Sequence, residues 1–347
     1  MFYIEQKGHI NKYILLIITL FIAFYLGFRP HDIGSDTRLY YNLNKFININ
    51  SILYQVEREP VYYFFVAIIN FITNNATFVF LSISVALGLT LFGFMKNQIN
   101  SLFLPVILVY TWGHFLFLTY NINITRQGFA TVFAFLLFNN ILKHKKIKII
   151  HFILILLATQ SHYSAYILLP FYILFIITRK FHYKTISVIF FCLSLFILLV
   201  DTSLVTKNFV LIVTEYLNLP DIIAFRIEKY LDISTKVKIS YGFIISILIT
   251  TLFLSLGDIL HDKSKKIILL GLFFYLFLFI LFGHNEIFSR LTLYFWIFEF
   301  IALGNILEYY YPRSRPVFYS IVLFIPIAVF KTYFTLMKSE FFIEKLS

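Results

Sequence analysis

Asp36 and Tyr40 are the first pair of side chains whose types and spacing could do chemistry. Residues four apart share one face of a helix. A tyrosine ring can cover the apolar face of a sugar, and a carboxylate beside it can accept the proton of a hydroxyl group. The pair therefore indicates a carbohydrate site. The alternative is that Asp36 only caps a helix that begins after Gly34.

Arg126 and Arg290 each stand at the beginning of an expected membrane helix, and Arg226 lies in a long loop. A cation at a helix N-terminus opposes the helix dipole, so this placement favours a bound anion. A phosphate group would accept hydrogen bonds from the guanidinium and from the backbone of the helix start. The alternatives are that Arg126 extends to the membrane surface and that Arg226 is a solvated loop charge.

His162 and Glu59 are two further polar residues that border apolar segments. His162 lies between two short apolar runs, where an imidazole could transfer a proton or bind a phosphate. A hydrogen-bonded turn histidine is the simpler alternative. Glu59 precedes Pro60, a residue suited to the first position of a helix, and a carboxylate there favours the positive end of the helix dipole. A helix start alone would also explain Glu59.

Sequence motifs for nucleotides and metals are absent from the chain. There is no GxxxxGK[ST] loop and no GxGxxG turn, no HExxH or CxxC pair, and no G-x-S-x-G elbow. We therefore expect no cofactor and no metal site. An enzyme built from this chain would use a substrate that is already activated and already in the membrane.

The composition is that of a membrane protein. Of the 347 residues, 60% are hydrophobic and 13% are charged, whereas a soluble chain is about 25% charged. A helix needs ~20 apolar residues to cross ~30 Å of hydrocarbon. The length therefore predicts an all-α, polytopic integral membrane protein with roughly ten to twelve transmembrane helices, arranged as one membrane domain over residues 1–347. The single cysteine, Cys192, excludes an intrachain disulfide.

Apolar segments and basic clusters together predict a topology. The expected spans are 13–28, 78–95, 102–119, 127–142, 149–159, 163–177, 185–200, 241–260, 267–283, 291–307 and 317–334. Segment 60–73 is short for a full crossing, and we expect it to be re-entrant. If it crosses fully instead, either the loop 29–59 is cytoplasmic or Lys96 lies outside. The clusters expected in the cytoplasm are 143–148, 179–184, 263–266 and 313–315.

This topology places two long loops, 29–59 and 201–240, on the outer face of the membrane. Apolar and aromatic residues within them favour amphipathic helices on the bilayer surface. The net charge of +12 follows from basic cytoplasmic loops, so we expect no nucleic-acid partner.

Several short motifs follow one another in a fixed order against the spans. They are Gly34-Ser-Asp36-Thr-Arg-Leu-Tyr40, Glu59-Pro60, Thr125-Arg126-Gln127, the lysine-rich stretch 143–148 and Ser161-His162-Tyr163-Ser164-Ala165. In this order and spacing the chain resembles the EpsG family, within the wider group of Wzy-type polysaccharide polymerases. The resemblance covers roughly residues 10–180 and weakens beyond, where it depends on Ser289-Arg290 and Tyr294.

The resemblance implies an activity at the outer face of the bacterial inner (cytoplasmic) membrane. Such proteins join oligosaccharide repeat units carried on undecaprenyl pyrophosphate. The growing chain leaves its lipid pyrophosphate and passes to a hydroxyl group of an incoming unit, for capsule, O-antigen or exopolysaccharide. The implied partners are the lipid-linked oligosaccharide, membrane lipid, a chain-length regulator and a flippase.

The resemblance also implies roles for the polar residues. The base for the accepting hydroxyl group would be Asp36 as first choice and His162 as second. The expected substrate-binding residues, which would hold the pyrophosphate or contact the sugars, are Arg126, Arg290, Arg226, Tyr40, Glu59 and Tyr163.

Three other functions remain open on the sequence. A membrane glycosyltransferase that uses a polyprenyl-phosphate sugar would need the same lipid and a similar acidic loop. A non-catalytic flippase of the lipid-linked oligosaccharide should carry charges deep in its spans, whereas here the conspicuous charges gather at span ends, which favours an enzyme. A membrane acyltransferase would use its histidine on acyl groups, and His162 alone does not exclude it.

Overall fold

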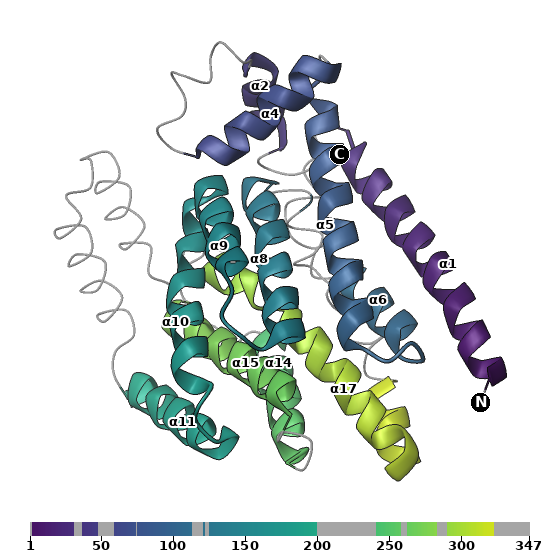
Figure 1. Cartoon of the computed structure of the whole chain (residues 1–347), viewed down its shortest axis with the longest axis vertical. Helices are drawn as coiled ribbons and strands as arrows, with labels where there is room; N and C mark the ends of the chain where they lie inside the picture. The colour runs from purple at the N-terminus through teal and green to yellow at the C-terminus, as the bar shows by residue number, and fades with distance from the viewer. Residues whose placement is uncertain are drawn as a thin grey trace. The chain divides into compact units, whose positions relative to one another are not determined.

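A computed structural model describes residues 2–30, 37–47, 59–73, 75–112, 121, 125–199, 241–257, 262–282 and 290–322 (Figure 1). All regular elements in these ranges are helical. Two helices, Thr77–Gln98 and Lys263–Phe282, are long and apolar enough to cross a membrane, and several shorter helices are apolar. The expected all-α membrane fold is confirmed, and the number of crossings stays a prediction.

The chain divides into two compact units. Unit 1 comprises Met1–Leu168 and Leu303–Ser347, and unit 2 comprises Leu169–Ala302. The helices of unit 1 are α1 (Phe2–Gly27), α2 (Thr37–Phe46), α4 (Pro60–Thr73), α5 (Thr77–Gln98), α6 (Leu104–Trp112), α8 (Thr125–His144), α9 (Ile149–Ser161) and the 3-10 helix η1 (Tyr163–Ile167).

Glycines let α1 and α5 approach closely in unit 1. A Cβ atom added at Gly27 would lie 2.6 Å from the Cα of Leu81, and one at Gly88 would lie 3.2 Å from the Cβ of Ala23. In lipid, where helix association depends on van der Waals contact, small residues make such packing favourable. Helix α5 also packs on α8, and α8 on α9, so these helices form a continuous bundle.

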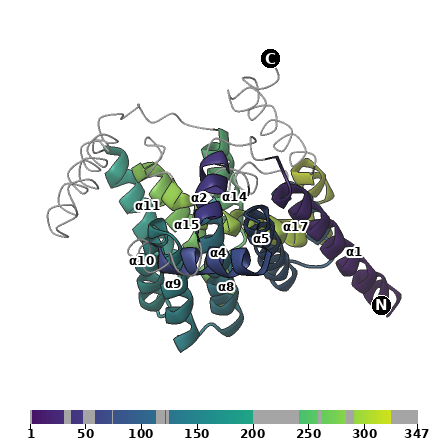
Figure 2. The same cartoon turned by 90° about the horizontal axis from the view of Figure 1, so that it is seen from above.

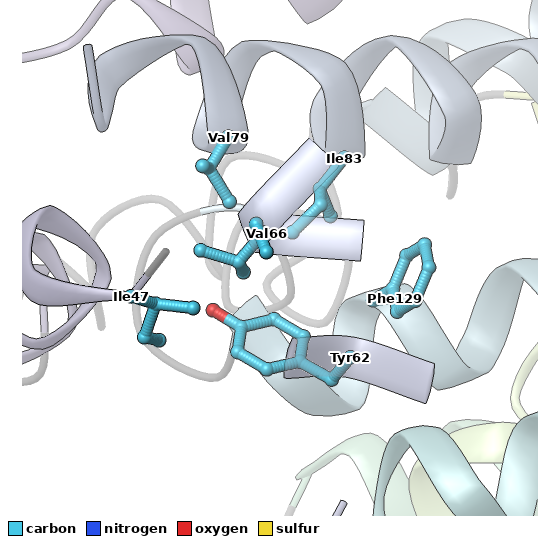
Figure 3. Close-up of a cluster of buried hydrophobic side chains, with 7 residues drawn as sticks. Ile47, Tyr62, Val66, Val79, Ile83 and Phe129 are labelled. Carbon is cyan, nitrogen blue, oxygen red and sulfur yellow. The ribbon is translucent and has the colours of Figure 1, made fainter. Parts of the chain in front are cut away.

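The short helix α4 lies across the ends of α8 and α9, as Figures 1 and 2 show. A cluster of buried side chains fixes it there (Figure 3). Tyr62 and Val66 of α4 meet Val79 and Ile83 of α5 and Phe129 of α8 in this cluster. The expected segment 60–73 is therefore a helix with those bounds, while its re-entrant character stays a prediction.

Unit 2 is built on aromatic packing. It contains α10 (which begins at Leu168 and ends at Thr178), α11 (Tyr183–Leu199), α14 (Tyr241–Ser255), α15 (Lys263–Phe282), the 3-10 helix η3 (Arg290–Tyr294) and the first turns of α17 (Ile297–Arg313). The ring of Phe171 lies 5.6 Å from that of Phe274 and 5.9 Å from that of Phe298. Gly271 leaves the space that the ring of Phe298 occupies.

Two expected helices begin differently in the structure. The segment expected as a helix over 291–307 starts with η3, and its α-helix begins at Ile297 and continues to Arg313. The backbone N–H of Phe295 donates to the carbonyl of Thr292 at 3.0 Å, a 3-10 hydrogen bond that carries the aromatic residues 294–296 into the core. Segment 163–177 likewise opens with η1 before α10 begins.

Candidate active site

Three charged or titratable side chains from distant parts of unit 1 meet at one point. The Oε2 atom of Glu59 lies 2.6 Å from Nη1 of Arg126, and its Oε1 atom lies 2.6 Å from Nδ1 of His162. The three residues belong to the start of α4, the start of α8 and the junction of α9 with η1. One carboxylate therefore joins three helix ends.

Local backbone structure explains the positions of Glu59 and His162. Glu59 precedes Pro60, the first residue of α4, and its carbonyl accepts a hydrogen bond from Tyr63 N–H at 3.2 Å, as expected at a helix start. His162 adopts an extended conformation between α9 and η1. Its N–H donates to Ala158 and its carbonyl accepts from Ala165, both at 3.0 Å. The backbone of His162 thus connects the two helices, and the contact with Glu59 holds its ring.

The carboxylate is the most enclosed member of the cluster. The side chain of Glu59 is 2% exposed, against 28% for Arg126 and 23% for His162. Burial alone raises the pKa of Glu59, but the hydrogen bond with His162 and the charges of His162 and Arg126 outweigh burial and lower the pKa below its ordinary 4.5. Glu59 is therefore an anion, and its partners retain access to a ligand.

Aromatic rings surround the guanidinium. The Cζ atom of Arg126 lies 5.1 Å from the ring centroid of Tyr40, which is a cation–π distance. Tyr63 also lies near Arg126. The Nε atom of Arg126 is buried and has no hydrogen-bond partner among the described residues. An additional acceptor such as a phosphate oxygen would therefore reach the guanidinium through its exposed part, since the side chain is 28% exposed.

Hydrogen bonds hold the helix that carries Tyr40. The hydroxyl group of Tyr62 donates to Oδ1 of Asn44 at 3.2 Å. Asn70 donates from Nδ2 to the carbonyls of Asn44 and Ile47, at 2.5 and 2.8 Å. Because Tyr40 and Asn44 are four residues apart, they lie on the same buried face of α2. These bonds attach α2 to α4 and place the ring of Tyr40 beside Arg126.

The structure brings together four of the sequence-predicted site residues: Glu59, Arg126, His162 and Tyr40. Tyr163 follows His162 in η1 and is 46% exposed. The first-choice base, Asp36, and the candidate cation Arg226 lie outside the described residues. Arg290 opens the 3-10 helix η3 in unit 2, and its expected place at the start of a membrane span stays a prediction.

Sequence reasoning missed two aspects of the site. It treated Arg126 as a cation that needs a ligand to offset the helix dipole, whereas the structure supplies Glu59 for that purpose. It also assigned no role to Asn44 or Tyr62. Two sequence features could have identified these residues: Asn44 follows Tyr40 by four residues, and Tyr62 lies in the segment that follows Glu59.

In the described part of the chain, no three His, Cys, Asp or Glu side chains come together as metal ligands would. Glu59 and His162 are two such side chains, but they bind each other. The arrangement offers an imidazole that can transfer a proton and a guanidinium that can bind an anion.

Comparison with known proteins adds the family. The model of the EpsG family matches residues 12–344, which extends the resemblance well past residue 180. Neither a curated protein nor a solved structure gives a match. Because the family model covers nearly all of its 347 residues, the chain belongs to the EpsG family.

Proposed function

We propose that this protein is a membrane-embedded polysaccharide polymerase that joins oligosaccharide repeat units carried on undecaprenyl pyrophosphate. Membership of the EpsG family supports a polymerase role in exopolysaccharide biosynthesis. The observation that carries the proposal is the cluster in which Glu59 binds both Arg126 and His162. In this proposal the chain crosses the bacterial inner membrane several times, and the cluster faces the outer side.

In the proposed reaction His162 is the base. Glu59 accepts the hydrogen bond from Nδ1–H, so the ring carries its proton on Nδ1 and presents the lone pair of Nε2 on the opposite side. Nε2 takes the proton of the acceptor hydroxyl group while the oxygen forms a bond to the anomeric carbon of the donor chain. Asp36 remains a second candidate for this proton.

Arg126 serves the leaving group in this scheme. The bond between the anomeric carbon and the pyrophosphate oxygen breaks as the new glycosidic bond forms, and the bonding electrons remain on the pyrophosphate. Its negative charge is stabilised by the guanidinium and the N-terminus of α8, where Arg126 is the second residue. Tyr40 orients the guanidinium through its ring and Tyr163 contacts sugar.

A deletion strain tests the proposal by gel analysis of its surface polysaccharide. The wild-type gene should restore a ladder of polymer, whereas His162→Ala and Arg126→Ala should leave single repeat units at wild-type expression. His182→Ala and Arg313→Ala are matched controls, because His182 is exposed and Arg313 stacks on Tyr309 rather than binding Glu59. Both controls should restore the ladder.

Other outcomes separate the competing functions. If the deletion strain lacks even the single capped unit, the defect precedes polymerisation, and a flippase or a glycosyltransferase that uses a polyprenyl-phosphate sugar accounts for it. If His162→Ala and Arg126→Ala both restore a normal ladder, the cluster has no part in the reaction.

A further inference from the structure

Unit 2 contains an apolar groove between α10, α11 and α15, with a volume of about 350 Å³. Its walls include Leu174 and Ile177 of α10, Ile189 and Leu193 of α11, and Phe277 of α15. Ile177, Ile189 and Leu193 are 51%, 47% and 41% exposed. The groove therefore opens to the surroundings of the protein.

The floor of the groove is formed by packed aromatic rings. Phe190 is 5% exposed, stacks on Phe273 at 5.3 Å and meets Phe277 edge-on at 6.3 Å. Thr178 is the lining residue with a hydroxyl group, and that group donates to the carbonyl of Leu174 at 2.6 Å. A ligand in this groove must therefore present an apolar chain.

Three cations stand at one end of the groove. Arg179, Lys180 and Lys184 lie in and beside the connection between α10 and α11, and all three are exposed. They are interleaved along the chain with two groove residues, Phe181 and Ile186. None of the three has an ion-pair partner among the described residues. The groove thus joins a hydrocarbon slot to a site of positive charge.

We propose that this groove binds an anionic phospholipid of the bilayer. The phosphate lies against Arg179, Lys180 and Lys184, and one acyl chain fills the space between Ile189 and Phe277. Basic pockets between membrane helices suit lipid head groups of high negative charge, such as that of cardiolipin. This lipid site is separate from the proposed polymerase reaction and does not depend on it.

Native mass spectrometry tests the role of the three cations in lipid binding. The purified full chain is measured in micelles with added cardiolipin or phosphatidylcholine. Cardiolipin should bind at least about tenfold more tightly than phosphatidylcholine, since each of the three cations contributes about fivefold near an anionic lipid. The triple variant Arg179→Gln, Lys180→Gln, Lys184→Gln should lose this preference. The control variant Lys143→Gln, Lys146→Gln, Lys148→Gln removes three exposed lysines from the last turn of α8 and the connection to α9 and should keep this preference.

A second pair of variants tests the groove itself. Ile189→Trp fills the slot, whereas Val188→Trp adds the same ring at a neighbouring residue of α11 that is 60% exposed and does not line the groove. Gel filtration checks that each variant remains folded. Cardiolipin affinity should fall several-fold for Ile189→Trp alone. Equal affinities in the two tryptophan variants, or equal losses in the two charge variants, would overturn the proposal.

Discussion

Each carboxylate oxygen of Glu59 has its own partner, with Oε2 at 2.6 Å from Nη1 of Arg126 and Oε1 at 2.6 Å from Nδ1 of His162. The first contact neutralises a cation that the dipole of α8 disfavours. The second selects the tautomer of the imidazole. A single side chain thus controls both the anion site and the base, and substitutions at Glu59 should affect both.

Glu59→Gln keeps the shape of the side chain and removes its charge. We expect the variant to lose polymer formation and about 2 kcal/mol of stability, since Arg126 remains without its counter-ion and His162 loses its carboxylate partner, while both side chains keep partial contact with solvent. Unfolding in mixed detergent micelles and the polysaccharide ladder measure the two losses. Wild-type values for Glu308→Gln, a carboxylate near the end of α17, provide the control.

The lowered pKa of Glu59 also predicts a pH dependence. Because the folded state binds the proton less well than the unfolded chain, the stabilisation is fully present above the ordinary pKa of 4.5 and is lost as the pH falls below it. The difference in melting temperature between wild type and Glu59→Gln should therefore be present at pH 5 and shrink as the pH falls below about 4.5. A difference that grows as the pH falls below this value would contradict the assignment.

At the scale of residues, the sequence identified the members of the candidate site but not the contacts between them. Polar residues beside apolar membrane segments cost free energy and usually have a role. This made four site residues recognisable: Glu59, Arg126, His162 and Tyr40. Glu59 and His162, however, are separated by 103 residues, and no periodicity connects residues so far apart. Arg29 was also passed over as a loop residue, whereas it is buried and donates to Leu26 O at 2.8 Å and to Thr37 Oγ1 at 3.2 Å.

The attachment of α2 to α4 governs the site at the scale of elements. Tyr62 is fully buried and donates its hydroxyl group to Asn44. Asn44→Ala leaves that donor without an acceptor, which should cost about 1–3 kcal/mol and lower polymer yield by displacing Tyr40. Asn42→Ala removes the same group from an exposed position of α2 and should change neither stability nor yield.

The contact between α1 and α5 gives a second prediction for elements. Gly27→Ala places a Cβ atom 2.6 Å from the Cα of Leu81, so the two helices must separate. Such overpacking typically costs about 1–3 kcal/mol. Gly93→Ala, where a Cβ atom meets nothing within 4 Å, should be neutral or stabilising. Equal unfolding midpoints for the two variants would show that the close approach does not matter.

Two helix boundaries show what sequence patterns can and cannot predict. Pro60 and the apolar run after it gave α4 its bounds of 60–73, because proline marks a helix start. The start of α17 was set too early, at 291 instead of Ile297. Composition does not distinguish a 3-10 turn from an α-helix, and the turn at Arg290–Tyr294 is fixed by burial of Tyr294, Phe295 and Trp296.

At the scale of the whole molecule, the length of α8 determines how far the candidate site lies from the lysine-rich stretch 143–148 at the other end of that helix. Its 20 residues extend about 30 Å, the thickness of the hydrocarbon layer. On a Cys192→Ser background, Lys146→Cys should react with a membrane-impermeant maleimide only from the cytoplasm. Tyr163→Cys should react only from outside. Labelling of both from one side would contradict the proposed topology.

The separation of Glu59 from its partners along the chain also affects how the protein is made. Arg126 follows it by 67 residues and His162 by 103. At synthesis rates of about 5–20 residues per second, the carboxylate is produced about 5–20 s before the histidine. Arg126 is produced between the two, so it is the first partner available to the carboxylate. We expect the cluster to be completed only once the chain through His162 has been synthesised.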